Sequence, residues 1–187
     1  MDEEAAYEGQ VSVVHLLQVL RDDIGLDKIA ARVQRLLTGI KVASYYGCTL
    51  LRPQTTAIDN MENPRVLQNL VRILGGTVID FPFATECCGS FQVVDNRGLV
   101  NERAYEIISS AVKNGAEVLL VSCPLCEFNL RQAQVKLKEK YTDFKELPIL
   151  YFTQLTALAF NLHFVLKDFE LNSTETQLWL KKKKLVN

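Results

Sequence analysis

The stretch "GAEVLLVSCPLCEFNL", Gly115 to Leu130, is the most informative part of the chain for its architecture. Its "EVLLVS" segment is a short, nearly continuous apolar run, which is typical of a strand that is covered on both faces. The following "PLC" begins a predicted helix over 124–140, and proline is favoured in the first turn of a helix. A buried strand that passes directly into a helix is typical of a parallel α/β sheet.

Three more apolar runs outside this stretch predict further strands. They are "KVASYY" (41–46), "TVIDF" (77–81) and "ILYF" (149–152). Helical segments separate these runs, and strands that alternate with helices indicate repeated βαβ units. The sequence therefore predicts an α/β fold with a parallel sheet of about four strands, flanked by helices.

The helices between the strands carry recognisable start and stop signals. The segment "NPRVLQNLVRILGG" predicts a helix with Asn63 as its cap, Pro64 in its first turn and Gly75 at its end. A second helix is predicted over 99–115. Thr153 is the predicted cap of a last helix that runs to about Leu166.

Two short helices are predicted ahead of the first strand, as an N-terminal appendage. Apolar residues recur there at i, i+3, i+4 and i+7, and Gly39 is a plausible stop. The apolar positions are Val13, Leu16, Leu17, Leu20, Ile29, Val33, Leu36 and Leu37. We therefore expect residues 1–39 to be an arm, disordered over 1–10, with this helical appendage. Residues 40–170 would form the α/β domain, and 171–187, with the basic run Lys181 to Lys184, a solvated tail.

The composition indicates a cytoplasmic globular protein. The chain has 187 residues, of which 48% are hydrophobic and 23% charged, with a net charge of −1. This balance gives no general attraction to nucleic acid or to anionic membranes. The acidic start "MDEEAAYEGQ" does not resemble a targeting peptide, and "LTALAFNLHFVL" (155–166) is too short to span a bilayer. Cytosolic thiols stay reduced, so clustered cysteines indicate metal binding or redox chemistry.

All five cysteines follow predicted strands. They are Cys48, Cys87, Cys88, Cys123 and Cys126. The carboxyl ends of parallel strands meet at one edge of a sheet, where ligands bind. The strand-to-helix connections over 48–63 and 82–98 are long, which is typical of functional loops, and both carry cysteine. We therefore expect a thiol-rich pocket at this edge.

The adjacent pair Cys87–Cys88 favours a polynuclear guest, because neighbouring side chains diverge too far to share one tetrahedral ion easily. Gly89 removes a Cβ, so the backbone can turn sharply and approach the guest. Iron and sulfide are soft partners for thiolate, and an iron–sulfur cluster is the natural candidate. Electrons would have to come from a partner, because the chain has no nucleotide-binding glycine fingerprint.

Other interpretations of the cysteines remain open. Four of them could form a zinc site, in a scaffold module of a larger complex. "SCPLC" also matches a thioredoxin-like dithiol at a helix start, although this leaves Cys48 and the pair unexplained. A metal-free scaffold with inert buried thiols is the third alternative.

A few polar and aromatic residues near these segments have simpler interpretations. His15 and His163 are expected to be surface or core side chains rather than ligands. Tyr45 and Tyr46 are expected to be packing residues, although one of them could hydrogen-bond near the pocket.

Three arginines are close in sequence to the cysteines, namely Arg52, Arg97 and Arg131. They are expected to be solvated, or to place a cation beside a thiolate cluster or an acidic substrate.

The cysteine pattern resembles the CCG domain found in the B subunits of the heterodisulfide reductase family. The phrases "YYGCTLLRP", "ECCGS", "GAEVLLVSCPLCEFNL" and "LPILYFTQL" carry this resemblance, which runs from about Val11 to Leu166. Family members usually have two such modules, and this chain resembles the second, C-terminal one.

The resemblance implies a noncubane [4Fe–4S] cluster. Its ligands would be Cys48, Cys87, Cys88, Cys123 and Cys126, with Gly89 beside them. The resemblance further implies an oxidoreductase subunit that reduces a disulfide by successive one-electron steps and needs partner subunits. The expected partners are an iron–sulfur electron-transfer subunit, like the C subunits of heterodisulfide reductases, and a flavin subunit or a second CCG chain.

Overall fold

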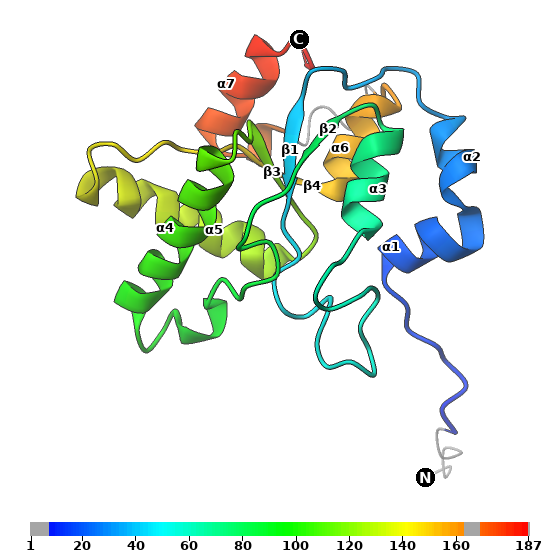
Figure 1. Ribbon diagram of the computed structural model, residues 1–187, viewed down its shortest axis with the longest axis horizontal. Helices are drawn as coiled ribbons and strands as arrows, with labels where there is room; N and C mark the ends of the chain where they lie inside the picture. Colours follow the sequence, from blue (N-terminus) through cyan, green and yellow to red (C-terminus); the bar gives the residue numbers. More distant parts are fainter. Residues whose placement is uncertain (1–7, 163–168, 187) are drawn as a thin grey trace, which may run out of the picture.

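A four-stranded parallel sheet forms the centre of the structure, in the strand order β2-β1-β3-β4 (Figure 1). The computed structural model describes residues 8–162 and 169–186. The principal elements follow one another along the chain as α1 (Leu16–Gln18), the π-helical η1 (Val19–Ile24), α2 (Leu26–Ala30), β1 (Lys41–Ser44), α3 (Val66–Ile73), β2 (Thr77–Ile79), the 3-10 turn η2 (Ser90–Gln92), α4 (Arg97–Lys113), β3 (Val118–Val121), α5 (Pro124–Lys140), β4 (Ile149–Tyr151), α6 (Phe152–Ala159) and α7 (Thr174–Lys182). The predicted α/β fold is confirmed.

The alternation of side chains along the strands creates two cores, one on each face of the sheet. Val42 of β1 and Leu120 of β3 pack with α3, α6 and α7. Ala43 and Leu119 point to the opposite face and pack with α4 and α5. Both faces are thus covered by helices (Figure 1), which explains why β3 is apolar at every position.

The N-terminal segment differs from the prediction in its second helix. That helix was expected to continue to Leu37, but α2 ends at Ala30. Beyond it, the backbone N–H groups of Gln34 and Arg35 donate to the carbonyl of Ala159, at 3.0 and 2.9 Å. The N–H of Leu37 donates to Leu74 O at 2.9 Å. These bonds tie the segment to α6 and α3 in place of a continued helix.

The prediction of a solvated C-terminal tail is wrong. Residues Thr174–Lys182 form α7, and Ser173 caps it by accepting a hydrogen bond from the N–H of Thr176. Trp179 and Leu180 are buried in the first core. The lysines of the basic run mask this apolar stripe in the sequence.

Two of the predicted helix caps are also wrong. The Asp59 Oδ2 atom, rather than Asn63, accepts the N–H groups of Arg65 and Val66 at the start of α3, both at 2.6 Å. Helix α6 begins at Phe152, so Thr153 lies inside its first turn.

Several expectations fall on residues that the structure does not describe. They are the first seven residues of the predicted arm and His163. The last helix was expected to run to about Leu166, but α6 ends at Ala159, and Asn161 then adopts a left-handed φ of +55°. Within residues 8–162 and 169–186, no helix combines the length and the apolar character that crossing a bilayer requires.

Candidate metal centre

The five cysteines lie on segments that leave the carboxyl ends of β1, β2 and β3. Cys48 lies in the turn after β1, and Cys87 and Cys88 lie in the loop between β2 and α4. Cys123 is the N-cap residue of α5, and Cys126 lies in the first turn of that helix. The strand order places β1 between β2 and β3, so the segments carrying the thiols are neighbours at one edge.

The structure brings the five thiols together. The Sγ atoms of Cys48 and Cys87 are 3.6 Å apart. Those of Cys88 and Cys126 are 3.5 Å apart, and Cys126 also hydrogen bonds with the Cys123 side chain. All five thiols are free, with no disulfide among them. We call this group the thiol cluster.

Two glycines shape the backbone around the thiol cluster. Gly89 has a φ of +75°, in the left-handed region, and the N–H of Gly89 donates to Cys87 Sγ at 3.3 Å. Its Cβ position is uncrowded, since the nearest atom, on Val100, would be 3.6 Å away. The close approach occurs instead at Gly47, where a Cβ would lie 3.1 Å from Cys126 Sγ and where φ is +63°.

Buried polar side chains hold the loops that carry the thiols. The hydroxyl of Tyr45 donates to the carbonyl oxygen of Glu86 at 2.6 Å, and Asn129 Nδ2 donates to that of Cys88 at 2.8 Å. Asn129 lies on α5, one turn beyond Cys126, so it links this helix to the loop of the cysteine pair. Asn129 also hydrogen bonds with the thiol of Cys88 and thereby helps to lower its pKa.

The protonation of the thiols differs from one to the next. The hydrogen bond with Cys126 lowers the pKa of Cys88 to about 6 and that of Cys123 to about 5. The pKa of Cys126 is raised far above its ordinary value. The largest cause is its hydrogen bond with Cys123, followed by its hydrogen bond with Cys88 and then by burial. Burial raises the pKa of Cys48 as well. Thiolate, the form that binds metals, is therefore favoured at Cys88 and Cys123.

The predicted neighbours of the cluster have varied roles. Arg52 Nη1 donates to Thr85 O at 3.2 Å and so joins the Cys48 loop to the loop of the cysteine pair. Arg131 pairs with Glu127 at 2.7 Å, and Arg97 lines a separate hollow between α4 and α5.

The two tyrosines and His15 are engaged in other contacts. Tyr45 and Tyr46 are buried, and the hydroxyl of Tyr46 accepts the N–H of Leu67 at 3.0 Å. His15 Nδ1 accepts the N–H of Leu17 at 3.0 Å, and His15 Nε2 lies 3.0 Å from Ser122 Oγ.

The thiol cluster has the donor chemistry of a metal centre. Within the described residues, no three or more Cys, His, Asp or Glu side chains are already arranged to hold a metal ion, so the support comes from the kind and number of donors. The donors are five soft sulfur atoms on three separate segments. Gly47 has no Cβ, so its backbone does not crowd the sulfur of Cys126. This donor set suits the iron and sulfide of a cluster.

Four contributors to the site were missed in the sequence. They are Gly47, Asn129, Ser90, which hydrogen bonds to Cys88, and Thr49, which hydrogen bonds to Cys123. Each is within three residues of a cysteine. Two signals in the sequence could have indicated Gly47 and Asn129. One is a glycine directly before Cys48, and the other is a carboxamide on the inner face of α5.

The sequence is similar to known redox subunits. Residues 42–131 match the family model CCG, described as a cysteine-rich domain. The chain is 30% identical over 155 residues to the 8-methylmenaquinol:fumarate reductase membrane anchor subunit of Wolinella succinogenes, covering 82% of this chain and 54% of the relative.

Two archaeal proteins are similar over the same share of the chain. A protein of Archaeoglobus profundus that is named as like the B subunit of heterodisulfide reductase is 29% identical over 161 residues, covering 82% of this chain and 53% of the relative. The B subunit of the ferredoxin:CoB-CoM heterodisulfide reductase of Methanosarcina mazei is 25% identical over 158 residues, covering 82% and 52%. The chain thus spans about half the length of the curated relatives it matches.

Proposed function

Because this chain belongs to the CCG cysteine-rich family, with the B subunits of heterodisulfide reductases among its relatives, we propose that it is the cluster-binding module of a thiol–disulfide oxidoreductase. The observation that carries the proposal is the meeting of five thiols from three loops, with Sγ–Sγ distances of 3.6 and 3.5 Å. Chance burial of inert cysteines would not bring every thiol of the chain to one edge of a sheet.

The proposed cofactor is a noncubane [4Fe–4S] cluster, which would supply one-electron chemistry when bound. The thiols of Cys48, Cys87, Cys88, Cys123 and Cys126 would hold it. Gly47 leaves room beside Cys126, and the N–H of Gly89 donates to Cys87 Sγ. Asn129 and Tyr45 keep the pair's loop in place through its backbone carbonyls. Cys88 and Cys126 are buried, so the protein excludes water from that side.

The proposed substrate is a disulfide or the thiols formed from it, and the activity would depend on partner subunits. An iron–sulfur subunit, like the C subunits of heterodisulfide reductases, would deliver electrons, with a flavin subunit or a second CCG chain as further partners. Exposed apolar side chains beside the thiols support a partner at this edge. Phe91, Leu125 and Phe128 are 76, 63 and 54% exposed, and each lies within three residues of a cysteine. We also propose a cytoplasmic location.

The cofactor is tested by reconstituting the purified full chain with iron and sulfide without oxygen. We expect about four iron and four acid-labile sulfide per chain, with broad visible absorption. Each of the five Cys→Ser variants should lower the iron content, whereas Ser109→Ala on α4 serves as a control with unchanged iron.

Two results would argue against this cofactor. Full iron content in one of the five cysteine variants would indicate an ordinary four-ligand cluster. A colourless protein with about one zinc per chain, and no sulfide, would instead support the zinc-binding scaffold.

A further inference from the structure

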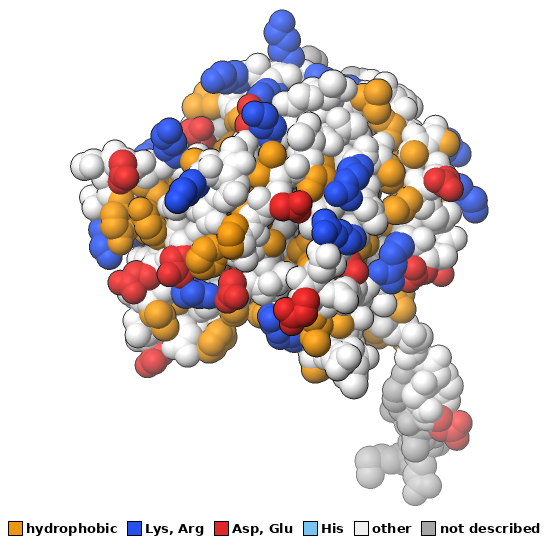
Figure 2. Space-filling model, in the orientation of Figure 1, with side chains coloured by type: hydrophobic (Ala, Val, Ile, Leu, Met, Phe, Trp, Pro, Cys, Tyr) orange, Lys and Arg blue, Asp and Glu red, His pale blue; other side chains and the backbone are white. Residues whose placement is uncertain are grey.

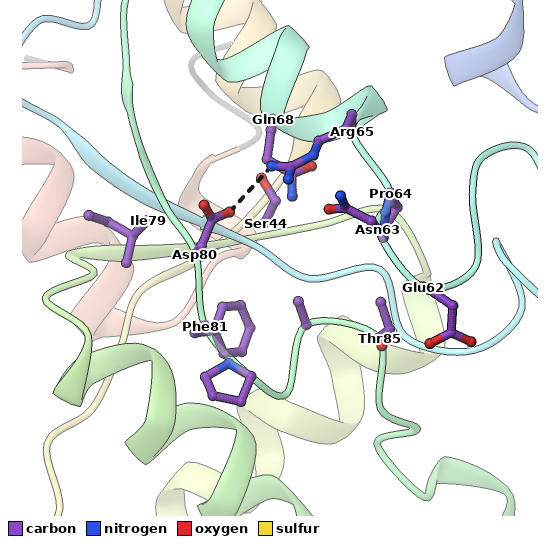
Figure 3. A pocket seen from close by; sticks show the side chains of 12 residues that line it. Ser44, Glu62, Asn63, Pro64, Arg65, Gln68, Ile79, Asp80, Phe81 and Thr85 are labelled. Atoms are coloured by element: carbon purple, nitrogen blue, oxygen red, sulfur yellow. Dashed lines mark ion pairs between the residues drawn. The ribbon is translucent and has the colours of Figure 1, made fainter.

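A second hollow lies near the thiol cluster, at the carboxyl ends of β1 and β2 (Figure 3). Its volume is about 300 Å³, and none of the five cysteines lines it. The lining comes from the end of β1, the segment 62–68 that leads into α3, and the segment 79–85 after β2. Ligands of parallel α/β proteins bind outside such strand ends.

The hydroxyl of Ser44 is the unusual feature of this hollow. Ser44 is 2% exposed, and its Oγ is buried with no hydrogen-bond partner in the described part of the chain. Figure 3 shows this side chain directed toward Gln68, Arg65 and Asp80. A buried hydroxyl is nearly always paired, so the Ser44 hydroxyl is a group to which a ligand in the hollow can hydrogen bond.

Gln68 presents a second buried polar group to the hollow. It is 6% exposed, and its Oε1 already accepts the hydrogen bond of the Tyr46 hydroxyl. The amide nitrogen of Gln68 is therefore the group available to a ligand. A hydroxyl and an amide donor side by side suit an acceptor such as a carboxylate.

Charges of both signs border the same space. Arg65 Nη1 lies 3.9 Å from Asp80 Oδ1, and the two side chains are 45 and 72% exposed. A long, exposed ion pair of this kind contributes little, so a ligand can replace either partner at small cost. Glu62 adds a second carboxylate, while Phe81 and Pro82 form an apolar wall.

We propose that this hollow binds a small zwitterion of the α-amino acid class. The ligand's carboxylate would bind Arg65, Ser44 and Gln68, and its ammonium group would bind Asp80. A simple anion would face Asp80 and Glu62, and a simple cation would face Arg65, whereas a zwitterion matches both signs. The volume accommodates one amino acid, with its side chain against Phe81.

This inference goes beyond the proposed function and does not depend on a bound cluster. The site is nevertheless connected to the cysteine pair through the chain. The lining segment that ends at Thr85 continues directly into Glu86 and Cys87, and Tyr46 N–H and Arg52 hold it at Ala84 O and Thr85 O. A bound amino acid would therefore stabilise the loop that carries the pair.

The test is calorimetric titration of the full chain with L-alanine, propionate and ethylamine as separate probes. Propionate lacks the ammonium group, and ethylamine lacks the carboxylate. We expect saturable binding of one L-alanine, and at least about ten-fold weaker binding of the other two, because each loses a charged hydrogen bond. No saturable binding of L-alanine, or equal binding of propionate, would overturn the proposal.

Two variants locate the site. Ser44→Ala and Asp80→Asn should each weaken L-alanine binding by about ten-fold, for the same reason. The matched controls Ser109→Ala and Asp143→Asn, away from the hollow, should leave it unchanged. Asp80 is exposed, so Asp80→Asn decides the question if Ser44→Ala does not fold. Wild-type affinity in a folded Ser44→Ala or in Asp80→Asn would assign the binding elsewhere and overturn the proposal.

Discussion

Single residues decide how closely the backbone approaches the thiol cluster. Gly47 and Gly89 both adopt positive φ angles, but only Gly47 lies where a Cβ would press against a cysteine sulfur. Gly89, the glycine of the CCG motif, thus allows a turn of the backbone, whereas Gly47, before Cys48, allows a close contact with a sulfur atom. The two positions look equivalent in the sequence, because a glycine signals conformational freedom without saying what lies next to it.

Replacing Gly47 by alanine should therefore affect the metal content as well as stability. The left-handed backbone alone costs about 1–2 kcal/mol, and the new methyl group would displace Cys126 Sγ. We expect Gly47→Ala to lower both the unfolding free energy in urea and the iron bound after reconstitution.

Gly115→Ala is the matched control for this prediction. Gly115 has a φ of +91° and nothing within 4 Å of its Cβ position, so this variant carries the backbone cost alone. Equal iron content in the two variants would show that the contact with Cys126 has no influence on the site.

Among the helices and strands, α3 is held beside the strand ends by side chains that cap its first turn from the preceding loop. Asp59 reaches over several residues to accept two N–H groups at the start of the helix, and Tyr46 accepts the N–H of Leu67. The same helix carries Gln68, which lines the second hollow. The capping bonds thus fix the start of α3 and, with it, the position of Gln68 in the wall of the hollow.

Asp59→Ala should lower the unfolding free energy by about 1–2 kcal/mol, the usual cost of a lost N-cap. Asn63→Ala is the matched comparison, because Asn63 is the residue that the sequence favours as the cap. Its effect should be close to zero in the same denaturant titration. If the two variants lose the same stability, the cap assigned to Asp59 is incorrect.

In the molecule as a whole, the chain wraps both ends onto one face of the sheet. Leu17 and Ile29 from the N-terminal helices, and Trp179 and Leu180 from α7, share the first core with β1 and β3. Figure 2 shows charges of both signs interspersed with hydrophobic side chains on the visible face, in keeping with the net charge of −1.

Leu180→Ala should destabilise the protein by about 2–5 kcal/mol, as expected for a cavity in a packed core. Leu180 is fully buried, whereas Leu178 on the same helix is 58% exposed. Leu178→Ala should therefore change the thermal unfolding midpoint very little. A small effect of Leu180→Ala would mean that α7 is dispensable.

The parallel sheet and the edge at which the cysteines gather follow from the amino-acid sequence alone. Strands with apolar runs and a helix that starts at Pro124 are local patterns, and parallel strands always expose their carboxyl ends together. The positions of the five cysteines after such strands were therefore enough to imply a common site.

Which groups face one another became visible only in three dimensions. Two examples are contacts between residues that are apart in the sequence, namely Gly47 with Cys126 and Asp59 with the start of α3. Two others depend on what packs around a segment, namely the burial of α7 and the unpaired hydroxyl of Ser44. Local patterns report the conformation of a segment and which side is apolar. They do not report what packs against that side, because close packing depends on the shapes of all the side chains that meet in each core.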